Sequence, residues 1–296
     1  MTELRIAAAP ISWGVCEVPA WGYVLDADTV LPAMAALGLT ATEFGPPGYL
    51  PTAPAELRAK LAAHGLTPVG GFLALALHRE PSTALATARE TAALFAATGA
   101  EVLVLAAATG EDGYDARVPL TDHEWRTLID TAASIADIAA EHGLHTTLHP
   151  HVGTHVETEA EVRRFLADSD LDLCLDTGHL AIGGTDPVAL ARQYPNRIGH
   201  IHLKDVRLAI ADEVRSGRME YSRAVREGMY VPLGQGDVDI AALVHAVRAA
   251  GYTGWYVLEQ DTALNPGDTA AGPDRDTEVS LRHLAEIGAE QASTRI

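Results

Sequence analysis

The chain has 296 residues, 48% of them hydrophobic, and its 21 basic and 40 acidic residues give a formal net charge of −19. A surface this acidic repels phosphate backbones and anionic membranes, so we expect no nucleic-acid and no membrane partner; small neutral or cationic substrates stay open. No apolar run approaches the roughly 18–20 residues that span a bilayer, and the N-terminus lacks the pattern of a secretory signal. We therefore expect a cytoplasmic protein in which Cys16 and Cys174 are reduced thiols.

Short apolar segments that predict β-strands alternate along the chain with alanine-rich segments of helical periodicity. The predicted strands are 5–12, 40–44, 67–75, 101–107, 144–149, 171–176, 197–203 and 254–259. Helical segments such as 55–65 and 124–143 lie between them, and glycine often follows, where a left-handed residue ends a helix. This alternation predicts an α/β fold, a single (β/α)8 TIM barrel domain over 1–296. A doubly wound open sheet is disfavoured because no glycine-rich phosphate-binding loop follows an early strand.

Three connections are expected at the rim of the barrel. Two of them, 45–51 and 265–274, are rich in proline and glycine and follow the second and eighth predicted strands. The longest, 205–237, follows the seventh strand, and we expect a short helix within 209–228. Its length suits a lid over the barrel mouth, the alternative being an insertion without a function.

Histidines gather at the ends of the later predicted strands. Seven of the thirteen fall between His145 and His202, and each strand end in this region carries imidazole or carboxylate, as does the later segment 255–261. In a barrel the carboxyl ends of all strands meet on one face. Histidine, aspartate and glutamate are ligands of divalent ions such as Mn²⁺, Co²⁺ and Zn²⁺. The sequence therefore predicts a metal-dependent enzyme.

Asp176 and Glu259 are predicted metal ligands. Asp176 closes a strand, and the next helix is expected to start near Asp186, too far away for Asp176 to cap it. Glu259 ends a run that should be wholly buried, where a carboxylate needs a metal or a cation as partner. His179, three residues after Asp176, is either a further ligand or a group that faces the substrate.

The seventh predicted strand carries His200, His202 and Lys204. We interpret the two histidines as pointing to opposite sides of the strand, so that only one is a ligand. His202, nearer the carboxyl end, is the predicted ligand, and His200 is expected to be a core histidine. Lys204 would share the orientation of His202 and reach a substrate oxygen, with a solvated surface lysine as the alternative.

The remaining candidates come from other strand ends. His149 and His151 flank Pro150, which marks the end of the fifth strand, and either is able to bind metal. Glu43 is expected as a polar group on the opposite wall of the barrel. Trp13 and His78, on loops after the first and third strands, are expected to line the substrate pocket with Cys16 and Glu17; a helix cap or rim contact is the alternative for each.

Two motifs, D-T-G-H (176–179) and H-I-H-L-K-D (200–205), together with Glu259, resemble the xylose-isomerase-like barrel superfamily of sugar isomerases and epimerases. Segments 10–23, 40–51 and 148–158 more closely resemble the inosose dehydratases within it. The resemblance covers essentially the whole chain and implies the same barrel fold.

The resemblance also implies a set of metal ligands. Members of the superfamily typically hold the ion with a glutamate, an aspartate, a histidine and a glutamate from strands five to eight. The last three correspond to Asp176, His202 and Glu259, whereas His149 stands in place of the first glutamate. The histidine at the position of His179 usually contacts substrate. Mn²⁺ or Co²⁺ is the expected ion, with Zn²⁺ and Mg²⁺ as alternatives.

His149 bears on the reaction, because epimerases of this type use a pair of carboxylates. Dehydration instead needs a base for the proton alpha to the carbonyl and an acid for the departing hydroxyl. Glu259 or an imidazole would be the base, and His149, His151 or His179 the second group. The resemblance thus implies a hydro-lyase that removes water from an inosose (2-keto-myo-inositol, scyllo-inosose) through a metal-stabilised enolate, in myo-inositol catabolism.

Three alternatives stay open. The first is a sugar or keto-inositol isomerase or epimerase on the same metal-dependent barrel. The second is a metal-dependent phosphodiester hydrolase, which the net charge of −19 disfavours. The third is a barrel that binds a small polyol without catalysis. Superfamily members often form dimers or tetramers, so a homo-oligomer is compatible with the sequence.

Overall fold

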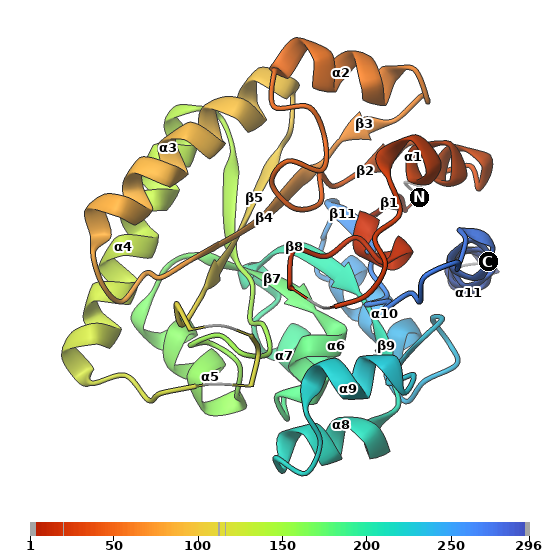
Figure 1. The fold of residues 1–296 in the computed structure, drawn as a ribbon. Coiled ribbons are helices and arrows are strands. Elements are labelled where there is room, and N and C mark those ends of the chain that lie inside the picture. Colours follow the sequence, from red (N-terminus) through yellow and green to blue (C-terminus); the bar gives the residue numbers. More distant parts are fainter. Residues whose placement is uncertain (1–3, 20, 112, 116, 294–296) are drawn as a thin grey trace.

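A parallel sheet curls into a barrel with helices around it in the computed structural model, which describes residues 4–19, 21–111, 113–115 and 117–293 (Figure 1). The strand order is β3–β2–β1–β11–β8–β7–β6–β5–β4. The strands are β1 (Arg5–Ala8), β2 (Ala41–Thr42), β3 (Thr67–Pro68), β4 (Gly70–Leu75), β5 (Val102–Ala107), β6 (His145–Leu148), β7 (Asp172–Asp176), β8 (Ile198–Leu203) and β11 (Trp255–Leu258). Each lies within a predicted strand, and the first is shorter than predicted because Pro10 begins a 3-10 helix, η1 (Pro10–Trp13).

The barrel closes at the third predicted strand, which Val69 divides into β3 and β4. β3 pairs with β2, and β4 pairs with β5. The amide of Val69 donates to the carbonyl of Thr42 at 3.0 Å, while its own carbonyl accepts from the amide of Val102 at 3.1 Å. One residue therefore joins the two ends of the sheet, and the predicted (β/α)8 barrel is confirmed.

The outer helices begin and end at residues of the expected kinds. Capping boxes start α4 at Thr121 and α5 at Thr158. Gly99 and Gly143 follow α3 and α4 with positive φ, as the sequence predicts for helix ends. None of the helices in the described ranges is long and apolar enough to cross a bilayer. The helices are α1 (Ala27–Ala36), α2 (Pro54–Ala62), α3 (Pro81–Thr98), α4 (Asp122–Glu141), α5 (Glu159–Asp168), α6 (Thr177–Ile182), α7 (Pro187–Gln193), α10 (Ile240–Ala249) and α11 (Ala271–Ser293), with the 3-10 turn η2 (Pro195–Arg197) before β8.

Alternate residues of each strand face two different environments. On β5, Leu103 and Leu105 belong to the large apolar core that includes residues of the helices. Val104, between them, packs with Cys174 of β7 in a separate small cluster. The period of two along a strand explains this division, with one face toward the helices and the other toward the barrel axis. Polar residues that share the parity of Val104 and Cys174 on these strands are therefore carried toward the interior.

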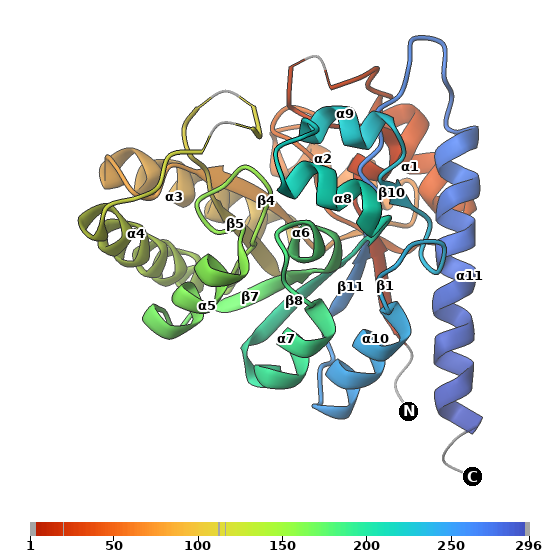
Figure 2. The same ribbon diagram turned by 90° about the horizontal axis from the view of Figure 1, so that it is seen from below.

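The long connection after β8 is an ordered subdomain. It contains β9 (Asp205–Val206), α8 (Leu208–Arg215), α9 (Tyr221–Arg226) and β10 (Tyr230–Val231), so two helices replace the one short helix expected. β9 and β10, at the two ends of this subdomain, pair antiparallel. The Asp205 carboxylate accepts the amides of Gly234 and Gly236, both at 2.9 Å. Figure 2 shows α8 and α9 beyond the ends of the barrel strands, where a lid would lie.

Candidate active site

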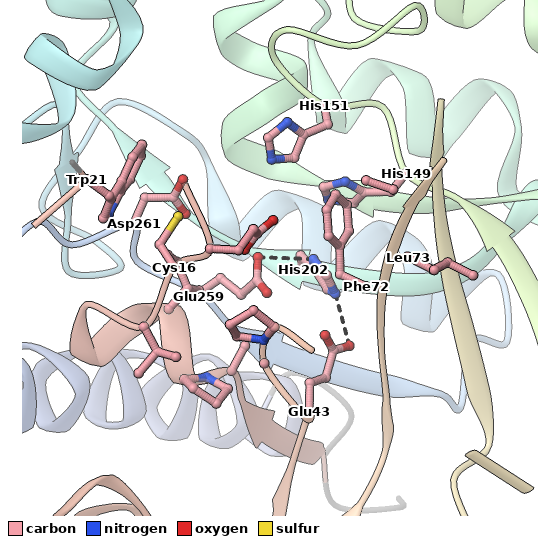
Figure 3. A pocket seen from close by; sticks show the side chains of 18 of the residues that line it. Cys16, Trp21, Glu43, Phe72, Leu73, His149, His151, His202, Glu259 and Asp261 are labelled. Atoms are coloured by element: carbon pink, nitrogen blue, oxygen red, sulfur yellow. Dashed lines mark hydrogen bonds and ion pairs between the residues drawn. The ribbon is translucent and has the colours of Figure 1, made fainter. Parts of the chain in front are cut away.

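A cavity of about 290 Å³ opens at the carboxyl ends of the strands. Figure 3 shows side chains from several strand ends pointing into it, with dashed lines from His202 to Glu43 and Glu259. Its lining combines ionisable groups with aromatic rings and includes Cys16, Glu17, Trp21, Glu43, Phe72, Tyr114, His149, His151, His202, Lys204, Glu259 and Asp261. The rim segment 45–51 contributes Gly45, Pro46 and Pro47.

Asp176 lies at the end of β7 and is completely buried. One carboxylate oxygen, Oδ1, accepts the amide of His179 at 2.8 Å and caps α6, which begins at Thr177. The expectation that the next helix starts near Asp186 was therefore wrong, because a short helix intervenes; Asp186 caps α7. The second oxygen, Oδ2, lies 3.2 Å from Nε2 of His149. Only one of the two carboxylate oxygens therefore caps the helix.

Possible ligand atoms of Asp176, His202 and Glu259 lie close together. Nδ1 of His202 lies 3.1 Å from Oε2 of Glu259 and 3.7 Å from Oδ2 of Asp176. One ligand atom from each of the three residues lies within 4.8 Å of the other two. Burial raises the pKa of Glu259, but the His202 imidazole and the Lys204 ammonium outweigh it and lower this pKa to about 2. The buried carboxylate of Asp176, the mostly buried carboxylate of Glu259 and an imidazole at such spacing fit a divalent cation in donor type and charge.

His149 directly follows β6 and lies next to this group. Besides its contact with Asp176, its ring lies 5.0 Å from the ring of His202 between centroids. Its Nδ1 is buried without a hydrogen-bond partner among the described residues. Ligand atoms of His149 also lie within 4.8 Å of those of Cys174 and His202, and of Asp176 and His179. His149 is thus placed at the edge of the three-residue group, where a fourth ligand would stand.

His151 and His179 form a second imidazole pair, with ring centroids 3.8 Å apart. Nδ1 of His151 lies 2.6 Å from the carbonyl of Val152, and Nε2 of His179 lies 3.2 Å from Nζ of Lys204. Burial, and then the neighbouring His149, lower the pKa of His151 to about 3. Both rings are therefore held neutral beside the carboxylates; burial first, and also the positive charge of Lys204, lower the pKa of His179 well below its ordinary value.

Lys204 is only 3% exposed and is not a solvated surface lysine. Its Nζ lies 2.5 Å from Asp261 and 3.0 Å from Glu259. Burial lowers the pKa of Lys204, but the carboxylates of Asp261, Glu259 and Asp176 outweigh it and raise this pKa above its ordinary value. The ammonium is thus a fixed positive charge on the wall of the cavity.

Asp261 and Tyr221 belong to the site although they were not among its predicted members. The Tyr221 hydroxyl donates to Oδ2 of Asp261 at 2.6 Å and lies 2.8 Å from the Tyr230 hydroxyl. Asp261 stands two residues after Glu259, and this spacing was a signal for it. Tyr221 lies on α9 in the subdomain after β8, 40 residues before its partner, and no pattern in the sequence indicates the contact.

His200 and His202 lie on the same side of β8, so the interpretation of opposite sides was wrong. Residues two apart in a strand share a face, and Ile201 and Leu203 occupy the other face, in the main core. Nε2 of His200 lies 2.8 Å and Nε2 of His202 3.1 Å from the same oxygen of Glu43. Glu43 therefore faces both histidines across the barrel.

Two predicted pocket residues lie elsewhere. Trp13 is fully buried in η1, and its Nε1 donates to Asp274 of α11 at 2.8 Å. His78 packs edge-on against His155, with ring centroids 4.4 Å apart. Neither lines the cavity, because η1 turns Trp13 toward α11 and the loop after β4 carries His78 toward His155. Cys16, three residues after Trp13, does line it, and both Cys16 and Cys174 are free thiols.

Comparison with known proteins defines the class. A family model described as "Xylose isomerase-like TIM barrel" matches residues 31–287. The zinc-bound crystal structure of IolI protein superposes with a TM-score of 0.72 at 14% identity, covering 97% of this chain and 99% of that one. A probable 3-DHS dehydratase, AsbF from Bacillus anthracis, superposes with a TM-score of 0.70 at 17% identity, covering 95% and 99%. The chain belongs to the xylose isomerase-like TIM barrel family.

Within that family the chain is similar to inosose dehydratases. It is 32% identical to the inosose dehydratase of Geobacillus thermodenitrificans, over 90% of this chain and 94% of that one. It is 34% identical to that of Geobacillus kaustophilus, over 89% and 90%. The predicted resemblance is thus confirmed, and the likeness identifies the chain as an enzyme of the hydro-lyase class.

Proposed function

We propose that the chain is a metal-dependent dehydratase that removes water from an inosose, in the breakdown of myo-inositol. The observation that carries this proposal is the convergence of Asp176, His202 and Glu259 beside His149, in a chain similar to inosose dehydratases along most of its length. A small polyol ketone is the expected ligand of the cavity. A cytoplasmic location, a single domain and association into a homo-oligomer stay predictions.

Asp176, His202 and Glu259 would hold the ion, with His149 as fourth ligand. Mn²⁺ or Co²⁺ is the proposed ion, and Zn²⁺ and Mg²⁺ are alternatives; the IolI protein was solved with zinc. When bound, a divalent ion supplies Lewis acidity that favours loss of the proton next to the substrate's ketone. Two imidazoles soften the donor set relative to a set with three carboxylates, which suits Mn²⁺, Co²⁺ or Zn²⁺ better than Mg²⁺.

The chain's own residues would move the protons. Glu259 or a neutral imidazole takes the proton alpha to the ketone, and His149, His151 or His179 delivers a proton to the departing hydroxyl. His151 lines the cavity and is neutral, so it would have to take up a proton, such as the one removed alpha to the ketone, before it delivers one to the hydroxyl. Lys204, as a fixed cation, would orient a substrate oxygen. Glu43 would face the substrate from the opposite wall, whereas Trp13 and His78 have no place in this proposal.

The test is to incubate metal-loaded protein with scyllo-inosose and follow the absorbance of the dione product. We expect turnover with Mn²⁺ or Co²⁺, loss of turnover after chelation, and loss in Asp176→Ala and Glu259→Ala. Deuterium incorporation from solvent at a stereocentre without loss of water would instead support an epimerase. That result would overturn the dehydratase proposal while leaving the metal site in place.

A further inference from the structure

The imidazole of His202 has carboxylates on both of its sides. Its Nδ1 faces Glu259 at 3.1 Å, and its Nε2 faces Glu43 at 3.1 Å (Figure 3). Glu43 and His202 are 2% and 1% exposed, so water does not compete for these contacts. The two ring nitrogens therefore have different partners: Nδ1 the proposed ligands, and Nε2 a carboxylate outside that group.

Glu43 also contacts a second histidine, His200. The same oxygen of Glu43 that contacts His202 lies 2.8 Å from Nε2 of His200, which is completely buried. A carboxylate oxygen accepts hydrogen bonds, so each of these imidazoles must carry its proton on Nε2 to satisfy the contact. Glu43 is thus fixed by two N–H donors from one face of β8.

A metal ligand needs the opposite condition at its ligating nitrogen. A neutral imidazole carries one proton, and with that proton on Nε2 the lone pair is on Nδ1. Nδ1 is the nitrogen of His202 that faces Asp176 and Glu259. Carboxylates that accept the remote N–H of a metal-bound histidine orient the ring and strengthen it as a ligand.

We propose that Glu43 is a positioning residue for the metal site, holding the His202 proton on Nε2 so that Nδ1 binds the ion. His200 anchors Glu43 in this orientation. This inference rests on the proposed function only for the presence of an ion at Asp176, His202 and Glu259. The contact uses one oxygen of Glu43, so it leaves the proposed place of Glu43 on the cavity wall unchanged.

A second metal ion held by Glu43, His200 and His202 is the competing explanation, since their ligand atoms also lie within 4.8 Å of one another. Hydrogen bonding favours the positioning role, because two N–H donors on one carboxylate oxygen balance the buried charge without a cation. The two explanations differ in stoichiometry: one ion per chain, or two.

The experiment measures Zn²⁺ binding without substrate, by competition with a chromophoric chelator, in wild type and Glu43→Gln. We expect one ion per wild-type chain and about 10–100-fold weaker binding in the variant. Asp205→Asn is the matched control, because it also removes a buried carboxylate, here one that accepts backbone amides away from His202. We expect the control to lose stability but keep its affinity for Zn²⁺.

Nitrogen chemical shifts of the Zn²⁺-loaded, ¹⁵N-histidine-labelled protein give a second readout. The signals of His202 are those missing from the spectrum of His202→Gln. We expect His202 to carry its proton on Nε2 and to bind Zn²⁺ through Nδ1. The inference is overturned if Zn²⁺ is bound through Nε2, if Glu43→Gln binds as tightly as wild type, or if wild type holds a second ion that this variant loses. Failure to dehydrate an inosose would overturn the proposed function alone, because no substrate enters these measurements.

Discussion

His149 is the residue that most distinguishes this site from the ligand set implied by the resemblance. It directly follows β6, with Nε2 at 3.2 Å from Asp176, where a glutamate would otherwise stand. An imidazole contributes no negative charge, so the proposed set of two carboxylates and two imidazoles is neutral with a divalent ion. Histidine in place of glutamate at this position therefore affects both the ion that the site prefers and the groups that are able to transfer protons.

Exchanging His149 for glutamate tests that view. We expect His149→Glu to keep metal binding but to shift preference from Zn²⁺ toward Mn²⁺ and Mg²⁺, because oxygen ligands favour the harder ions. The ratio of dissociation constants for Zn²⁺ and Mn²⁺ measures the shift. His149→Ala is the control and should weaken both ions. An unchanged ratio in His149→Glu would show that His149 is not a ligand.

At the scale of elements, strand ends were predictable but some short elements were not. Apolar runs with a polar final residue located Asp176 and Glu259 at strand ends, because buried parallel strands leave few other places for charge. The six-residue helix α6 escaped prediction, since all six residues are buried and show no polar face. No pattern in the sequence therefore indicated that Asp176 caps this helix.

Contacts between distant elements were the other gap. Tyr221 reaches Asp261 from α9, and Asp261 in turn holds Lys204. Such contacts depend on how the subdomain after β8 folds back over the barrel, which local periodicity does not encode. The placement of Trp13 against α11 has the same origin, in the packing of η1 against a helix more than 250 residues away.

The Tyr221 hydroxyl ties α9 to the site, and its removal should loosen that helix. We expect Tyr221→Phe to speed amide hydrogen exchange in 221–226 by about 10–100-fold, because a hydrogen bond to a charged group contributes about 1.5–3 kcal/mol. Tyr23→Phe is the control, since Tyr23 is 46% exposed. Equal exchange in wild type and Tyr221→Phe would mean that the contacts of α9 other than this hydroxyl hold the helix in place.

For the whole molecule, buried imidazoles outside the site couple stability to pH. Burial, then the positive charges of His78 and Arg117, lower the pKa of His155 to about 4, although Glu161 and Glu124 act in the opposite direction. Burial, then Arg79, also lowers the pKa of His78. The unfolded chain therefore binds more protons than the folded chain below the ordinary histidine pKa of about 6.5.

Stability should accordingly fall as pH drops from about 6.5 toward 4, with His78 and His155 contributing. We expect His155→Gln to show a shallower loss of unfolding free energy across this window than wild type, in urea titrations with chelator present. The site histidines are common to both proteins, so their contribution cancels. Parallel pH profiles for the two proteins would exclude this pair as a source of the acid sensitivity.

The barrel brings Asp176, His202 and Glu259 together from chain positions up to 83 residues apart. The central claim is that this convergence binds one divalent ion. Anomalous diffraction from crystals grown with Mn²⁺ tests it most directly. The account predicts one peak per chain within bonding distance of Asp176, His202 and Glu259, with His149 beside it. A peak elsewhere, or none at this position in crystals that contain Mn²⁺, would contradict the account.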